Sequence, residues 1–165
     1  MNNCDCMAVA GKLASQIKQG AFLTVRAGER LNTMTIGWGL TGFIWQLPVF
    51  MVAVRDSRYT FELMEAATDF TVSLPYGDQA QALKLCGTKS GRDIDKFAAS
   101  GLKPVAAQQT LSPVLDLAGL HYECRIRFKA PMDPGLLDAQ LEYLYPAKDY
   151  HSLYFGEILA CYERD

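Results

Sequence analysis

The sequence predicts a mainly β domain of the α+β class, built as a small antiparallel β-barrel with short peripheral helices. Apolar segments of strand length are separated by glycine and proline turn signals along most of the chain. The helical segments between them are short and too few to cover both faces of a parallel sheet. The last third of the chain has mostly strand-like patterns. An open α/β sheet is the lesser alternative, because strands alternate with helices only in the middle third.

Length and composition predict one globular domain over residues 1–165, half of them hydrophobic. A net charge of −2 without a lysine or arginine cluster argues against nucleic-acid binding. The longest apolar run, residues 48–54, is far below the roughly 20 residues of a membrane-spanning helix. The N-terminus has no signal-peptide pattern, and five cysteines without framework spacing indicate reduced thiols. We therefore expect a cytoplasmic protein.

The first half of the chain predicts a helix, a hairpin and a buried strand. Val9, Leu13 and Ile17 recur every four residues, which is typical of an amphipathic helix over about residues 7–19 that ends at Gly20. Residues 22–26 and the strand after the turn at 27–30 form the hairpin. Residues 38–47 are an aromatic, glycine-rich connection. Pro48 then opens a buried strand over residues 49–54, where its missing N–H costs least.

The second half predicts further short helices and three closing strands. Residues 59–67 have helical spacing with Thr60 as a cap, and a strand at 69–74 ends at Pro75. Helices at 78–86 and 92–98 are expected to end at Gly87 and Gly101. Strands follow at 114–117, 119–130 and 153–162. Four leucines between the last two strands form an apolar stripe without an assigned type: Leu136, Leu137, Leu141 and Leu144.

Residues 32–38 form a strand that is unusually polar for a core element. Thr33 and Thr35 share one face, while Asn32, Met34 and Ile36 share the other. Small hydroxyls that lead into glycines allow a flat ligand to approach the backbone. Threonine is also a good strand former, so a plain strand explains this segment equally well by itself.

A second polar segment joins the strand ending at residue 54 to the next helix. Arg55, Ser57, Arg58 and Thr60 place guanidinium and hydroxyl groups beside the free amides of a helix start, which are the donors an anion site needs. The alternative is a solvated loop in which either arginine pairs with Asp56 or Glu62.

A third polar segment covers residues 86–97. Ser90 and Gly91 precede the helix expected from Arg92, so its first amides face the loop, and Lys96 follows about one turn later. The alternative makes Ser90 or Asp93 a helix cap, with Lys96 on the surface and paired to Asp93.

The remaining reactive side chains carry weaker signals. His121 alternates along a strand and is expected to be structural, whereas His151 is expected on a loop, where it would be the better proton donor or cofactor contact. Cys4 and Cys6 form a C-x-C pair that could be redox-active or bind metal. A frayed N-terminus with incidental cysteines explains the pair better, and no metal site is expected. The sequence also lacks nucleophile-elbow, G-x-G-x-x-G and Walker motifs.

In order and spacing, these segments resemble the flavin reductase-like FMN-binding split-barrel family, most closely its flavoredoxin branch. The resemblance rests on residues 32–38, 54–60 and 86–97, and on Asp149, His151 and residues 155–159 near the end of the chain. It covers roughly residues 20–162 and implies a Greek-key split barrel. One departure is Tyr150, which separates Asp149 from His151 where reductases of the family often have the two adjacent, so a nicotinamide contact of His151 is in doubt.

The resemblance also implies a cofactor site. Family members are homodimers that hold FMN without a covalent bond near the subunit interface, and several reduce it with NADH or NADPH. Residues 32–35 would line the flavin, with hydrogen bonds from Thr33 and Thr35. The ring and ribityl chain would be flanked by Trp38 and residues 55–60. The phosphate would be held by a further set with amide assistance near Gly87 and Gly91: Ser57, Arg58, Ser90 and Lys96. Tyr59 and Cys86 complete the implied FMN contacts.

Three functions follow from this resemblance. The first is an NAD(P)H-dependent flavin oxidoreductase, with Arg55 as the candidate to stabilise the reduced flavin and His151 as the second catalytic candidate. The second is an electron carrier that docks on a redox protein partner and does not itself oxidise nicotinamide. The third is a non-redox binding barrel for another phosphorylated ligand.

Overall fold

The computed structural model describes residues 2–165 and contains one large antiparallel sheet. The strands follow the order β3-β2-β6-β9-β10-β5-β4, and β1 pairs with the outer part of β10. All of these pairings are antiparallel, which confirms the expected strand arrangement and excludes the open α/β sheet. A separate ribbon pairs β7 with β8. The strands are β1 (Asn2–Asn3), β2 (Ala21–Ala27), β3 (Arg30–Ile36), β4 (Gly39–Ile44), β5 (Leu47–Arg55), β6 (Asp69–Pro75), β7 (Pro104–Val105), β8 (Val114–Leu115), β9 (Gly119–Pro131) and β10 (His151–Arg164).

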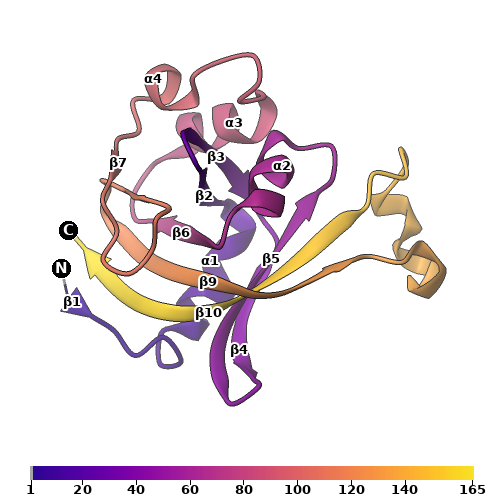
Figure 1. Ribbon diagram of the computed structural model, residues 1–165, viewed down its shortest axis with the longest axis horizontal. Coiled ribbons are helices and arrows are strands. Elements are labelled where there is room, and N and C mark those ends of the chain that lie inside the picture. The colour runs from indigo at the N-terminus through magenta and orange to yellow at the C-terminus, as the bar shows by residue number, and fades with distance from the viewer. Residues whose placement is uncertain (1) are drawn as a thin grey trace.

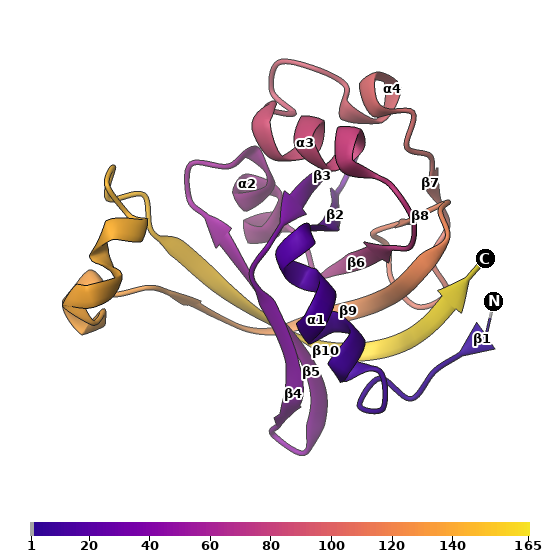
Figure 2. The same ribbon diagram turned by 180° about the vertical axis from the view of Figure 1, so that it is seen from behind.

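The sheet curls into an incompletely closed barrel, and short helices cover its surface (Figures 1 and 2). Along the described strands, the path ends at β3 on one edge and β4 on the other, without hydrogen bonds joining the two. Helices α2 and α3 pack against β2 and β3, and α1 lies against β4. The helical elements are α1 (Ala10–Gln16), η1 (Ile17–Gln19), α2 (Tyr59–Ala66), α3 (Ala80–Thr88), α4 (Lys96–Ser100), η2 (Pro134–Leu136) and η3 (Ala139–Leu144). None of the helices within residues 2–165 is long and apolar enough to cross a membrane.

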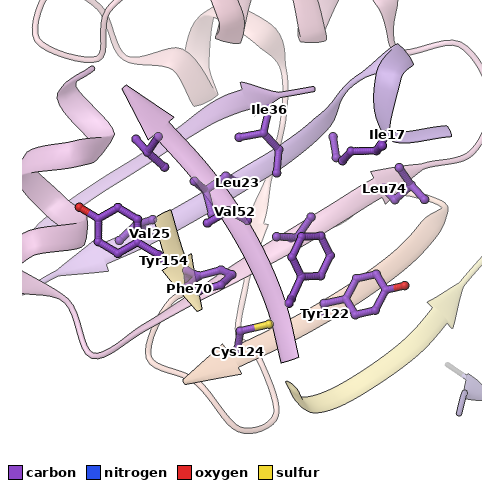
Figure 3. Close-up of a cluster of buried hydrophobic side chains, with 14 of the residues drawn as sticks. Ile17, Leu23, Val25, Ile36, Val52, Phe70, Leu74, Tyr122, Cys124 and Tyr154 are labelled. Atoms are coloured by element: carbon purple, nitrogen blue, oxygen red, sulfur yellow. The ribbon is translucent and has the colours of Figure 1, made fainter. Parts of the chain in front are cut away.

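The barrel interior forms the main hydrophobic core. Side chains from β2, β3, β5, β6, β9 and β10 converge there, including Leu23, Val52, Phe70 and Tyr154 (Figure 3). Phe22 points to the opposite face of β2 and joins a second cluster under α3 and α4. Both faces of β2 are therefore buried, because successive side chains of a strand point to opposite sides. This double burial fixes α3 and the following loop against the barrel beside β3.

Residues 39–44 are a strand, which corrects the expected irregular connection over residues 38–47. β4 pairs with β5 along its whole length, from Gly39 opposite Val52 to Ile44 opposite Leu47. The hairpin turns at Trp45 and Gln46, whose φ angles are 56° and 62°. Two positive φ angles in a two-residue loop match the twist of a hairpin, but the usual signal is Asn-Gly. The sequence therefore gives no recognisable turn here.

The helices around residue 90 also differ from the expectation. α3 continues through Gly87 to Thr88, and α4 begins at Lys96 instead of Arg92. Asp95 caps α4, because its carboxylate accepts the N–H groups of Phe97 and Ala98 at 2.9 and 3.1 Å. Residues 91–93 form a turn, so the helix start expected just after Gly91 is absent from this part of the described chain.

The long strands β9 and β10 form a bent hairpin that projects from the barrel as an arm (Figure 1). η2 and η3 lie at its end. Of the apolar stripe expected there, Leu136 and Leu141 are exposed, and Leu137 and Leu144 are half-buried. His151 is the first residue of β10 and not a loop residue, and it pairs with Arg55 on β5. The arm therefore returns directly to the end of β5, where the charged connection to α2 begins.

Candidate functional site

β3 presents two different faces to its surroundings. Asn32 and Met34 line a cavity on one face. On the other face, Thr33 is fully buried and its hydroxyl donates to the Leu23 carbonyl at 3.3 Å. Thr35 donates its hydroxyl to the Leu83 carbonyl at 2.6 Å, although it also borders a second cavity. Both threonine protons are thus used inside the protein, in contrast to the expected ligand-facing donors.

The first cavity has a volume of about 120 Å³ and brings the three polar segments together. Its lining comes from β3, from the loop and first turn leading into α2, and from the end of α3 with the loop that follows. The lining residues are Asn32, Met34, Lys96, residues 57–60 and residues 86–92. The sequence placed these segments in one site only through a resemblance, and the packing of α2 and α3 on β3 now explains their proximity.

The lining of the first cavity is rich in cations and hydroxyls. Arg58, Lys89 and Lys96 contribute positive charge, and Ser57 and Ser90 contribute hydroxyl oxygens. Ser57 donates its proton to the Asp149 carboxylate at 2.7 Å. Gly87 lies within α3 and receives Arg58 Nη1 on its carbonyl at 3.4 Å, so a carbonyl, and not the expected free amide, faces this arginine. This donor set is suited to an anion such as phosphate.

Gly91 allows the loop to approach β3 closely. A methyl group at Gly91 would lie 2.2 Å from Asn32 Oδ1 and 2.9 Å from Tyr59 Cδ1. Asn32 is held in place because its amide donates to Thr60 Oγ1 at 2.8 Å. Thr60 is therefore inside α2 and bonded to β3, whereas Arg58 occupies the cap position that we expected for Thr60. Only glycine fits this contact without displacing a cavity wall.

Lys96 is a buried link between β3 and α3. Its ammonium donates to the carbonyls of Cys86 at 2.8 Å and Thr33 at 3.0 Å, which uses two of three donors. The side chain is 4% exposed, and burial lowers its pKa. The surface lysine paired to Asp93 is thus excluded. Cys86 is also buried, and burial raises the pKa of its thiol, so it is an unreactive wall residue.

Arg92 closes one side of the first cavity and was not predicted as a site residue. Its guanidinium forms an ion pair with Glu62 and lies 5.4 Å from the centre of the Tyr59 ring. It also donates to the Ser57 carbonyl at 3.3 Å. Glu62 therefore pairs with Arg92, not with the arginines named in the solvated-loop alternative.

The second cavity has a volume of about 160 Å³ and adjoins the first, since both are lined by Met34 and Arg58. Its remaining lining comes from the ends of β3, β5 and β10 and from the residues after β3. These residues are Thr35, Ile36, Gly37, Trp38, Ala53, Arg55 and His151. Its lining combines the aromatic rings of Trp38 and His151 with the guanidinium groups of Arg55 and Arg58.

An aromatic cluster borders the second cavity. The Trp38 ring lies 4.8 Å from the His151 ring and 6.3 Å from the Tyr145 ring. The Tyr145 hydroxyl lies 2.9 Å from His151 Nδ1. Tyr145 was not predicted as a site residue, and the only signal in the sequence is a group of tyrosines between residues 143 and 150.

His151 is neutral at physiological pH. Burial, followed by the nearby Arg55 charge, lowers its pKa to about 4. Arg55 donates to the carbonyls of Asp149 at 2.5 Å and Leu144 at 3.0 Å, and it lies over the Tyr145 ring at 5.0 Å. Arg55 thus holds the end of the arm while it borders the second cavity, and the neutral imidazole of His151 faces that cavity with a fixed orientation.

His121 is structural, as expected. It is fully buried away from both cavities, and its ring nitrogens contact Ser73 Oγ at 2.9 Å and the Leu117 carbonyl at 3.1 Å. Within residues 2–165, no group of three or more His, Cys, Asp or Glu side chains is arranged to hold a metal ion.

The family model described as "Flavin reductase like domain" matches residues 16–165. The chain belongs to the flavin reductase-like family. It shares with that family the antiparallel split-barrel fold found in FMN-binding relatives.

Two solved structures share the fold of this chain. An FMN-binding protein from Thermus thermophilus, solved with bound 1-cyclohex-2-enone, is 26% identical, with a TM-score of 0.67 over 87% of this chain and 69% of that one. A flavoredoxin from Methanosarcina acetivorans is 23% identical, with a TM-score of 0.71 over 88% of this chain and 68% of that one. An uncharacterized Archaeoglobus fulgidus protein is 27% identical over 105 residues, which span 64% of this chain and 59% of that relative.

Proposed function

We propose that this chain is a single FMN-binding domain that acts as an NAD(P)H-dependent flavin oxidoreductase. The observation that carries the proposal is the direct contact between a cation-rich cavity and an aromatic cavity, which share Met34 and Arg58 as walls. A flavin mononucleotide has a phosphate at one end and a flat ring at the other. Its two chemical parts match the two cavities in this order.

The residues of the first cavity fit the phosphate end. Arg58 and Lys96 provide positive charge, and Ser90 provides a hydroxyl. The close approach at Gly91 leaves the loop backbone within reach of a ligand, where a side chain would fill the space. We assign phosphate binding to these four residues, with Asn32 and Tyr59 as the adjacent walls.

The residues of the second cavity fit the ring end and its chemistry. A bound flavin supplies the hydride-accepting group, so the protein only has to bind, orient and tune it. Arg55 contributes positive charge to this cavity, which would stabilise the negative charge of a reduced flavin held there. Neutral His151 offers a hydrogen bond without adding charge. Trp38 is 43% exposed and provides an accessible flat wall for a nicotinamide.

The first test is whether the purified protein contains FMN. We expect a yellow protein that releases FMN on heating, and a melting temperature that rises more with added FMN than with riboflavin, which lacks the phosphate. A colourless protein that gains no stability from FMN would overturn the proposal and would favour the non-redox barrel.

A second test separates the reductase from the electron carrier. Anaerobic mixing of the FMN-loaded protein with NADH, and separately with NADPH, should bleach the flavin absorbance rapidly with at least one of them. Bleaching by dithionite or a reduced ferredoxin, but by neither nicotinamide, would establish the carrier with its redox protein partner instead. The faster nicotinamide also gives the cofactor preference.

We also propose a homodimer that uses the tip of the β4–β5 hairpin. Phe43 and Trp45 are 64% and 49% exposed there, and Trp45 packs on Phe128 and Phe155 at ring distances of 5.7 and 6.0 Å. Leu40 and Ile44 of β4 are also exposed, at 52% and 43%, and Trp38 of the second cavity directly precedes this strand. A second copy that covers the hairpin would therefore lie close to the second cavity. Light scattering should give twice the chain mass, and Phe43→Ser should give a monomer. A monomeric wild-type protein would contradict this proposal.

The cytoplasmic location stays a prediction.

A further inference from the structure

Four of the five cysteines lie in or against the main core, and none of these four lines either cavity. Cys124 and Cys161 are buried in the main core, and Cys4 and Cys6 pack against its edge as partly buried residues. Figure 3 shows Cys124 within this core, whereas Cys86 belongs to the second cluster under α3. The C-x-C pair is therefore not at a frayed end, in contrast to the expectation from the sequence.

The N-terminal segment places Cys4 directly opposite Cys161. β1 pairs with β10 through Asn2 opposite Glu163 and Asn3 opposite Tyr162. The next step of this antiparallel register joins residues 4 and 161, and the N–H of Cys4 donates to the Cys161 carbonyl at 2.9 Å. Directly opposed residues joined by such a hydrogen bond have Cα atoms about 5.5 Å apart. Disulfides span Cα distances of about 4.4–6.8 Å, so this position accepts a cross-strand bridge.

The two thiols differ in accessibility. Cys4 is partly exposed, and its thiol donates to the Asn2 carbonyl at 3.4 Å near the surface. Cys161 is 6% exposed, and burial, with Cys4 and Cys6 nearby, raises its pKa to about 12. An external oxidant therefore reaches Cys4 first, because Cys161 is buried. Cys161 is also the weaker first nucleophile, since the thiolate is the attacking form and a raised pKa makes that form rare.

We propose that Cys4 and Cys161 form a dithiol redox site whose substrate class is a small-molecule disulfide such as glutathione disulfide. The Cys4 thiolate attacks one sulfur of the disulfide and releases the first thiol. Cys161 then loses its proton and attacks the Cys4 sulfur, which breaks the mixed disulfide and releases the second thiol. Two protein thiols are oxidised to one disulfide, and the small-molecule disulfide is reduced to two thiols. The product links the N-terminal segment to the last strand, independently of the flavin site.

The test is oxidation of the full chain with excess glutathione disulfide near the ordinary cysteine pKa of about 8.5, followed by alkylation and non-reducing peptide mapping. We expect a peptide pair linked through Cys4 and Cys161, and a melting temperature that rises on oxidation and returns with dithiothreitol. Cys161→Ala should trap glutathione on Cys4, because the resolving thiol is missing.

Two further variants make the result decisive. Cys6→Ser is the matched control, since Cys6 is also partly exposed, and it should retain the link between residues 4 and 161. Cys4→Ser should lose both the link and the rise in melting temperature. A bridge between Cys4 and Cys6, or a wild-type protein that keeps glutathione on Cys4 with Cys161 alkylated after denaturation, would overturn the proposal.

Discussion

The two adjoining cavities are built in different ways. The first is shaped by close backbone approach and by cations from neighbouring loops, with Gly91, Asn32 and Lys96 fixing its walls. The second is shaped by side chains from distant parts of the chain, with Tyr145 and His151 meeting Trp38 at the base of the arm. Changes in the first cavity should therefore alter flavin affinity, whereas changes in the second should alter reactivity.

The largest expected effect is on the pH dependence of the free energy of unfolding. One of the two histidines that cause it, His151, borders the second cavity and not the first. The folded-state pKa of His151 is about 4, below the ordinary value of 6.5, and His121 has the same shift. Between pH 6.5 and pH 4, both histidines are therefore protonated in the unfolded chain but largely neutral in the folded chain. This contribution to stability is complete above pH 6.5 and is lost as the pH falls to 4, by up to about 3 kcal/mol for each histidine.

The measurement is the free energy of unfolding between pH 7 and pH 4, from urea titrations. His151→Gln and His121→Gln should each make the pH dependence shallower by a similar amount, because both histidines have the same shift. The remaining pH dependence should include Glu65 and Glu163, whose pKa values are lowered by hydrogen bonds from Lys129 and Lys12. An identical pH dependence in the wild type and His151→Gln would show that the histidine at the second cavity is not held neutral by burial.

Gly91→Ala should weaken FMN binding about 100-fold, because overpacking of this kind costs about 1–3 kcal/mol. The new methyl group would displace Asn32 or Tyr59 from the wall of the first cavity. Gly42→Ala is the matched control, since a methyl group at Gly42 meets nothing within 4 Å. Fluorescence titration of the apoprotein with FMN measures both. Equal affinities for the two variants would place the phosphate elsewhere.

Arg58→Gln should weaken FMN binding about tenfold, because one charge-assisted hydrogen bond contributes about 1.5–3 kcal/mol and Arg58 is exposed. Riboflavin binding should change little, since riboflavin lacks the phosphate. Arg30→Gln, at the turn between β2 and β3, controls for the general loss of charge. If riboflavin and FMN lose affinity equally, Arg58 contacts the ring and not the phosphate.

Tyr145→Phe should have the smallest effect and should act only on reactivity. It removes one hydrogen bond to His151, worth about 1 kcal/mol, so flavin reduction by the preferred nicotinamide should slow about fivefold. FMN affinity should stay within about twofold. Tyr143→Phe, in the same segment and 73% exposed, is the control for stopped-flow measurements. A loss of FMN affinity without slower reduction would reverse the roles of the two cavities.

Local patterns account for most of the fold. The β2–β3 hairpin, β5, β6 and the long closing strands were predicted because apolar alternation and turn residues mark them in the sequence. β4 was missed, since Trp45 and Gln46 turn the hairpin without glycine. The start of α4 was misplaced by four residues, because Ser90, Asp93 and Asp95 are all acceptable caps and only tertiary packing selects Asp95.

The candidate site was predicted in part. The three polar segments do line one cavity, and Asn32, Arg58, Ser90 and Gly91 lie in it. The side-chain directions were predicted less well, as Thr33 shows by turning into the protein. Arg92 was missed because its ion-pair partner, Glu62, lies 30 positions away in the sequence. Tyr145 was missed because its contact with His151 depends on where β10 returns to β5.

The family, the antiparallel class and the polar segments can be recognised in the sequence, because they depend on local order, spacing and alternation. Three contacts depend instead on the folded chain: Lys96 is buried between β3 and α3, Tyr145 reaches His151, and Cys4 is hydrogen-bonded to Cys161. The physical reason is that strand register and helix packing bring together side chains whose separation along the chain carries no local signal.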